Sequence, residues 1–260
     1  MYRTFNFVPH IAAILGKPAH FDVWLYSNLS VVASAARIDK LKQQLTFISS
    51  GVPPVTTTTQ PTALSGAVGY VIPATRGSYY EVERLAANRG KLSALSEFVR
   101  SGSALVLLDG FQGNATANNS FLPLLSALLG ADPRCRAAGV ATTMLLQKRS
   151  TAPEFIELEN TIEVQPRLGL STLSCQTGQA IYSAFVDRQE VSTAVVWTLD
   201  GGAIYWIGSS FFKPNLRGFY DPPAHSQPGR ARLRRHGAGA TPAALAKTPG
   251  REGRMGLAPA

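Results

Sequence analysis

A short run that is apolar on both faces of a strand constrains this fold more than any other feature. Residues 104–108, ALVLL, offer no polar side to solvent and end at Asp109. Such a strand has to be covered on both sides, as in a mostly parallel sheet that lies between helices. The preceding segment has helical periodicity and ends near Gly102, which suits the left-handed residue after a helix; its apolar positions are Leu92, Leu95, Phe98 and Val99. We therefore predict a helix over 92–99 that leads into the strand.

The same alternation of strand and helix covers residues 21–130. Apolar strand runs occur at 21–26 and 67–73, and helical stripes occur at 38–50 and 122–129. Strands that alternate with helices pair in parallel, and right-handed crossovers place helices on both faces of the sheet. The predicted fold class is therefore α/β, with a doubly wound, mostly parallel sheet in a three-layer arrangement.

The pattern changes to shorter, β-rich pieces after Gly139. We predict strands at 140–146, 161–164, 180–186, 194–199 and 203–208. The last two strands flank Asp200-Gly201-Gly202, which is a strong hairpin signal because these turn residues accept positive φ. We expect this C-terminal hairpin to extend one edge of the sheet as an antiparallel addition.

The net charge of +9 is concentrated towards the C-terminus. Residues 221–260 hold seven basic residues against two acidic ones and almost no large apolar side chain. Such a segment cannot offset the entropy cost of ordering, so we predict one α/β domain over 1–220 and a disordered basic tail over 221–260. Its arginines could bind phosphate, although nucleic-acid binding is the weakest of the functional hypotheses. An alternative is that the residues after Pro223 come from untranslated or out-of-frame sequence.

No apolar run approaches the roughly 20 residues that a membrane-spanning helix needs. The segment Phe5–Gly16 is short, contains Asn6, Pro9 and His10, and has neither a strong basic start nor a small-residue cleavage site. We expect a soluble protein with no membrane span and no signal peptide, in a compartment that the sequence leaves open.

Several segments resemble the class I glutamine-amidotransferase-like superfamily. They are a helix that ends in EFVRSG, the strand ALVLLDG, a leucine-rich helix closed by Gly130, and WTLDGGAIYWIGSSFF near the end of the domain. The resemblance covers about residues 21–215 and implies a flavodoxin-like α/β fold. Members of this superfamily include trehalose-utilisation-type proteins and non-catalytic modules of gliding-motility and intraflagellar-transport proteins.

The chain departs from the catalytic members of that superfamily at the nucleophile. Those enzymes carry a cysteine in a Gly-x-Cys-x-Gly turn, with a downstream histidine and glutamate, and the turn exposes the thiol beside backbone N–H groups. Here residues 109–113 read DGFQG and contain neither cysteine nor serine. Cys135 and Cys175 lack that spacing, and they fit either a disulfide or two reduced thiols. The histidines lie towards the chain ends, at 10, 20, 225 and 236.

A polar rim at the carboxyl ends of the strands is the candidate ligand site. Asn28, Arg76, Asp109 and Asn114 each follow a predicted strand or lie in the loop after one, and ligands of open α/β sheets collect at such ends. A turn-forming role for Asp109 before Gly110 is the stronger alternative. No metal-ligand spacing occurs, so we predict no metal and no cofactor.

The sequence favours a non-catalytic binding or assembly module over an enzyme. A protein or a small polar molecule would be its partner. The alternative is a hydrolase-like or sugar-metabolising enzyme that uses a carboxylate near Asp109 at the same rim.

Overall fold

A computed structural model describes the chain at residues 8–15, 22–33, 35–110, 121–164 and 170–209. These residues belong to one compact unit, Met1–Leu216. The second unit, Arg217–Ala260, lies outside the described residues. The predicted domain boundary at 220 and the predicted disordered tail fall there as well.

The helix and strand on either side of Gly102 form as the sequence predicts. Helix α4 (Arg89–Arg100) begins at Asn88, whose side chain accepts a hydrogen bond from the backbone N–H of Lys91 at 3.3 Å. Gly102 has a φ of 105°, at which the backbone of a residue with a side chain would be strained. Strand β4 (Ala104–Leu108) follows. The helix is longer than predicted because polar residues fill its first turn, where no apolar stripe marks it.

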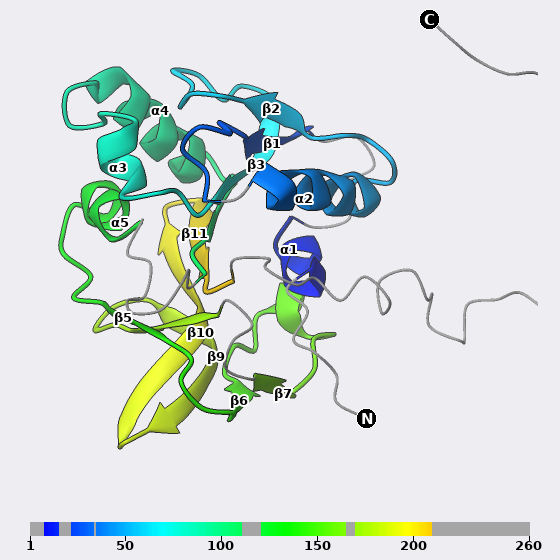
Figure 1. The fold of residues 1–260 in the computed structure, drawn as a ribbon, viewed down its shortest axis with the longest axis vertical. Helices are drawn as coiled ribbons and strands as arrows, with labels where there is room; N and C mark the ends of the chain where they lie inside the picture. Colours follow the sequence, from blue (N-terminus) through cyan, green and yellow to red (C-terminus); the bar gives the residue numbers. More distant parts are fainter. Residues whose placement is uncertain (1–7, 16–21, 34, 111–120, 165–169, 210–260) are drawn as a thin grey trace, which may run out of the picture. The chain divides into compact units, whose positions relative to one another are not determined.

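Residues from both halves of the unit build one mixed sheet with the strand order β2-β1-β3-β4-β11-β10-β9-β6-β7 (Figure 1). Strands β5 and β8 lie off this path, with β8 paired to β10 and β5 paired to β8. The strands are β1 (Asp22–Tyr26), β2 (Val55–Thr57), β3 (Ala67–Pro73), β5 (Arg136–Gly139), β6 (Met144–Lys148), β7 (Thr161–Val164), β8 (Ser171–Ser174), β9 (Gln179–Val186), β10 (Gln189–Leu199) and β11 (Gly202–Ile207).

The predicted doubly wound, mostly parallel, three-layer fold is wrong. Strands β2, β1, β3, β4 and β11 are parallel to one another. All pairings among the six strands from β5 through β10, and the pairing of β10 with β11, are antiparallel. The chain therefore has a strand-rich mixed sheet. The prediction failed because six strands, β5 to β10, extend the sheet in antiparallel order beside the five parallel ones.

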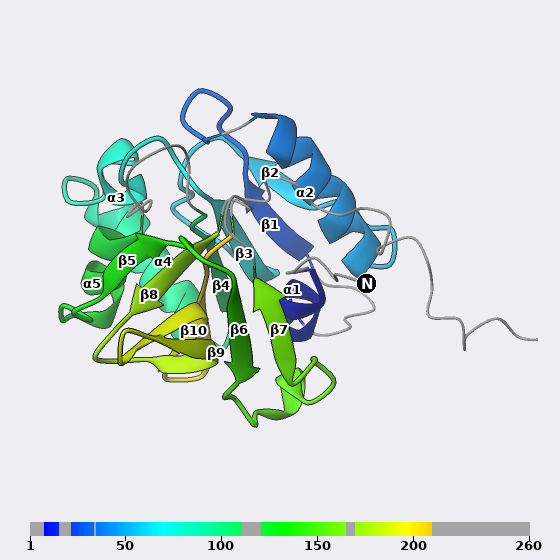
Figure 2. The same ribbon diagram turned by 60° about the horizontal axis from the view of Figure 1, so that its bottom comes forward.

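Helices flank the parallel part of the sheet. Helices α1 (Val8–Leu15) and α2 (Ala35–Ile48) lie on one face, and α3 (Tyr79–Val82), α4 and α5 (Leu122–Leu129) lie on the other (Figure 2). A short 3-10 helix, η1 (Pro153–Phe155), contacts α1. Helix α5 ends at Gly130, as predicted, and this glycine has the left-handed conformation.

The predicted C-terminal hairpin forms, but in the interior of the sheet instead of at an edge. Strand β11 pairs in parallel with β4 and antiparallel with β10. The reason given for its glycines is also wrong, because Asp200 is the turn residue with positive φ, at 50°. A Cβ at Gly202 would overlap the carbonyl oxygens of Val99 and Ser103, so this glycine is required for close approach to the end of α4.

Several elements were not predicted or were misplaced. They are α1, β2, α3, β5, η1 and β8, and β6 begins at Met144 where a strand from 140 was expected. These are short elements of three to eight residues. Such lengths carry too few periods for a pattern to identify them.

Candidate functional site

Asp109 lies where the sequence places it, at the carboxyl end of β4, but it is fully buried. The indole Nε1 of Trp206 donates a hydrogen bond to its carboxylate at 3.1 Å, and its backbone N–H donates to the carbonyl of Ile207 at 2.8 Å. Both partners belong to β11. The carboxylate therefore helps to hold β11 against β4, which is a different structural role from the turn-forming one weighed in the sequence.

The loops that carry Asn28 and Arg76 lie side by side. Val32 forms an antiparallel bridge with Thr75, and the backbone N–H of Arg76 donates to the carbonyl of Val31 at 2.7 Å. The Asn28 side chain accepts hydrogen bonds from the backbone and hydroxyl of Ser30, at 3.1 and 2.6 Å. The structure thus brings the loops of Asn28 and Arg76 together.

The predicted four-residue rim is not a shared open cleft in the described residues. Arg76 is exposed and Asn28 is half-buried, whereas Asp109 has no contact with solvent. Asn114, the fourth predicted residue, lies outside the described residues.

A second buried carboxylate, which sequence reasoning missed, lies on the α3 side of the sheet. Glu83 accepts hydrogen bonds from the Tyr26 hydroxyl at 2.6 Å, from the Gln60 backbone N–H at 2.8 Å and from the Lys91 ammonium at 2.8 Å. The Tyr79 hydroxyl in turn donates to the Gln60 side chain at 2.7 Å. This Glu83 network, defined by these five residues, joins β1, the β2–β3 connection, α3 and α4.

The charge state of the Glu83 network follows from its hydrogen bonds. Burial acts to raise the pKa of Glu83, but the bonds from Lys91, Tyr26 and Gln60 outweigh it and leave the pKa below its ordinary value. Burial, together with the Glu83 carboxylate, raises the pKa of Tyr26 well above the ordinary value, and burial together with Tyr70 does the same for the pKa of Tyr79. Glu83 is therefore ionised and both tyrosines are neutral at physiological pH.

Such an arrangement is suited to holding elements together, not to moving protons. Three donors occupy the two oxygens of Glu83, and a carboxylate with a lowered pKa is a weak base. No sequence signal could have revealed the network, because Tyr26 and Glu83 are 57 positions apart and share no motif.

The two cysteines form a disulfide between Cys135 and Cys175. The bond continues the β5–β8 ladder by one step beyond the pair Arg136 and Ser174. The open question of the sequence, disulfide or free thiols, is thus answered in favour of the disulfide. Neither sulfur is available as a thiolate nucleophile while the bond is intact.

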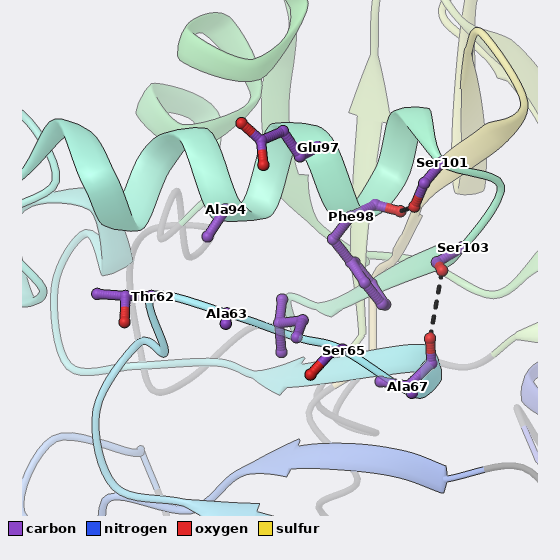
Figure 3. Close-up of a pocket in the computed structure, with 11 residues that line it drawn as sticks. Thr62, Ala63, Ser65, Ala67, Ala94, Glu97, Phe98, Ser101 and Ser103 are labelled. Carbon is purple, nitrogen blue, oxygen red and sulfur yellow. Dashed lines mark hydrogen bonds between the residues drawn. The ribbon is translucent and has the colours of Figure 1, made fainter.

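A groove of about 420 Å³ lies near the amino ends of the parallel strands, at the opposite end from the predicted rim. Helix α4 forms one wall, and the irregular segment 62–66, which ends in a turn, forms the other (Figure 3). The Phe98 side chain points from the helix into the space between them. The strand ends at Ala67 and Ser103 close the groove at its base, where the Ser103 hydroxyl donates to the Ala67 carbonyl at 3.3 Å.

Neither a metal-ligand cluster nor a membrane-spanning helix occurs in the part of the chain that the structure describes. It contains no group of three or more His, Cys, Asp or Glu side chains placed to hold a metal ion. Its helices include none that is long and apolar enough to cross a membrane.

No protein-family model matches this chain, and no curated protein matches it. Among solved structures, it is similar to the N-terminal domain of mmIFT52, with 13% identity and a TM-score of 0.49 over 73% of this chain and 86% of that one. Cytoplasmic protein STM1381 from Salmonella typhimurium LT2 gives 11% identity and a TM-score of 0.45 over 73% and 88%.

The exo-beta-1,4-mannosidase Op5Man5 from Opitutaceae bacterium strain TAV5 is a third similar structure, with 11% identity and a TM-score of 0.45. The match covers 73% of this chain but 31% of the mannosidase. Likenesses this distant identify neither a family nor an activity.

Proposed function

We propose that this chain is a non-catalytic binding or assembly module of the class I glutamine-amidotransferase-like superfamily. The observation that carries the proposal is the state of Asp109. It stands where catalytic members of that superfamily place their nucleophile turn, and it is a buried carboxylate bonded to Trp206. A group in this position cannot attack a substrate without first leaving the core.

The cysteines support the same proposal. Each sulfur is bonded to the other, at the end of the β5–β8 ribbon. Catalysis by a cysteine requires a free thiolate beside a base. Reduction of the disulfide would be needed before either residue could take that role.

The resemblance itself is supported by the unit of α4, Gly102 and β4 and by the β10–β11 hairpin beside it. These are the segments that carried it in the sequence. The antiparallel half of the sheet argues against a close relationship with the catalytic members, because it replaces a mostly parallel arrangement.

Glutamine hydrolysis by the purified chain, measured as released ammonia under oxidising and reducing conditions, tests this proposal. We expect no turnover in either condition. Turnover that appears on reduction and disappears in Cys135→Ser or Cys175→Ser would overturn the non-catalytic proposal. A glycosidase or esterase activity that Asp109→Asn abolishes, in a variant that keeps its melting temperature, would favour the alternative enzyme.

A further inference from the structure

The disulfide bears on the compartment in which this chain folds, which the sequence left open. Cys135 and Cys175 are the two cysteines of the chain, and they are bonded to each other. Disulfides persist in secreted proteins and in the lumen of the secretory pathway, whereas they are rare in the reducing cytosol. The bond therefore favours an oxidising compartment, where the modifications made in the secretory pathway become possible.

The turn after β1 carries an acceptor sequence for one such modification. Asn28-Leu29-Ser30 matches the Asn-x-Ser/Thr pattern of N-glycosylation, which needs a surface position. Leu29 is 58% exposed, and Ser30 is exposed as well. The backbone N–H groups of Val31 and Val32 donate to the Asn28 carbonyl at 3.1 and 2.9 Å, so the motif lies in a hydrogen-bonded turn at the surface.

The oxygen and the nitrogen of the half-buried Asn28 amide have different partners. Oδ1 accepts hydrogen bonds from the backbone and the hydroxyl of Ser30, as asparagine does in many turns. Burial raises the pKa of Tyr26, and a hydrogen bond from the Asn28 amide acts in the opposite direction. Nδ2 carries two hydrogens, and this bond takes one of them. A sugar on Nδ2 replaces the other hydrogen, so the linked amide can keep its contact with Tyr26.

We propose that Asn28 is an N-glycosylation site and that this chain folds in the oxidising lumen of the secretory pathway. The sugar donor is an oligosaccharide linked to a lipid diphosphate. The bond between the first sugar and the diphosphate breaks, a bond forms between that sugar carbon and Nδ2, Nδ2 loses one proton, and the lipid diphosphate leaves. The oligosaccharyltransferase of the host cell catalyses this step, so the inference goes beyond the proposed function and needs no active site in this chain.

Two further asparagines, Asn114 and Asn118, begin similar motifs. Both lie outside the described residues and carry no part of this proposal. The experiment therefore has to score Asn28 separately from them.

Site-specific mass spectrometry of the full chain tests the proposal. One sample is captured by antibody from the cells that naturally make the protein, and the other is secreted by cultured mammalian cells behind a heterologous signal peptide. A peptide N-glycosidase in heavy-oxygen water converts each glycosylated asparagine to labelled aspartate. Among secreted variants, Ser30→Ala removes the motif and keeps Asn28, whereas Ser30→Thr is the matched control that keeps the motif. Circular dichroism melting curves are recorded before and after the enzyme treatment.

We expect the label at Asn28 in both wild-type samples and in Ser30→Thr, and its loss in Ser30→Ala. The melting temperature should not change when the glycan is removed, because the turn is exposed. Thiol alkylation should find Cys135 and Cys175 oxidised in the natural chain. The proposal is overturned by unlabelled Asn28 in either wild-type sample or by reduced cysteines in the natural chain. A cooperative melting transition in Ser30→Ala that the glycosylated wild type lacks would overturn it as well.

Discussion

The strands of the parallel half of the sheet are buried on both faces, whereas strands of the antiparallel half are buried on one face. Strand β4, with helices on both sides, is buried from Leu105 to Leu108, and β3 is buried almost throughout. Strands β6 and β7 instead alternate between buried and accessible residues. On the accessible face, Leu145 is 56% exposed and Phe185 is 65% exposed. The parallel half is a two-sided core, and the antiparallel half is a one-sided one.

This difference shows what joins the halves. Strand β11 has a parallel neighbour, β4, and an antiparallel neighbour, β10. Asp109 and Trp206 connect β4 to β11 by side chains, and Gly202 allows the backbones at the end of α4 and the start of β11 to approach. Buried polar groups hold the parallel half, whereas a disulfide holds the β5–β8 ribbon of the antiparallel half.

The largest expected loss of stability comes from the Glu83 network. Glu83→Ala leaves the Lys91 ammonium and the Tyr26 hydroxyl without their shared acceptor. Removal of one partner of a buried ion pair costs about 3–5 kcal/mol in free energy of unfolding. Urea denaturation measures this loss. Because both side chains of the Arg100–Asp200 ion pair are exposed, Arg100→Ala is the control and should cost no more than about 1 kcal/mol.

The same network predicts a direction of pH dependence. Because the pKa of Glu83 is lowered on folding, its contribution to stability is present above the unfolded-state pKa, about 4.3, and is lost as the pH falls through the folded-state pKa. The wild type should therefore lose stability more steeply below about pH 4.3 than Glu83→Gln does. Parallel slopes for the two proteins would show that Glu83 is not ionised in the network.

A matched pair of leucines compares the two kinds of core directly. Leu107 is fully buried on β4, and Leu107→Ala should cost about 2–5 kcal/mol because it leaves a cavity. Leu145, on the accessible face of β6, should lose no more than about 0.5 kcal/mol when changed to alanine. Equal losses in urea melts would contradict the contrast between the halves.

Loss of the disulfide should lower the stability of the antiparallel half of the sheet more than that of the parallel half. The double variant Cys135→Ser/Cys175→Ser opens a link across 40 residues and should cost about 2–4 kcal/mol. Hydrogen exchange should report faster opening in β5 and β8, while the amides of β3 and β4 keep their protection relative to global unfolding. Equal changes in protection in β3 and β4 would show that the two halves unfold as one unit.

Two neighbouring glycines test the joint between the halves. Gly202→Ala places a methyl group against the carbonyl oxygens of Val99 and Ser103 and should cost about 1–3 kcal/mol. At Gly201 the nearest atom to an added Cβ is the carbonyl oxygen of Arg100 at 3.4 Å, so Gly201→Ala is the milder control. A smaller loss for Gly202→Ala than for Gly201→Ala, measured by thermal melting, would contradict the close approach.

Local patterns were enough to locate much of the parallel half. The strands at 67–73 and 104–108 and the helix at 122–129 were predicted with the bounds that the structure has. A continuous apolar run and a left-handed glycine are properties of neighbouring residues, so they can be read without knowledge of the rest of the chain.

The candidate site was less predictable. The sequence placed Asp109 at the end of a strand, but its burial depends on Trp206, which is 97 positions away. Glu83 carried no signal at all. The groove beside α4 depends on the crossover over residues 58–66, which contains neither helix nor strand.

The sequence alone determined which segments are buried on both faces, where α4 gives way to β4, and that a hairpin turns at Asp200. The tertiary structure decided that this hairpin lies inside the sheet, that five further strands extend it in antiparallel order, and that Cys135 meets Cys175. The physical reason is that periodicity reports the environment of each residue. Strand order and the partners of buried polar groups depend instead on which distant surfaces pack together, and those contacts leave no periodic trace in the chain.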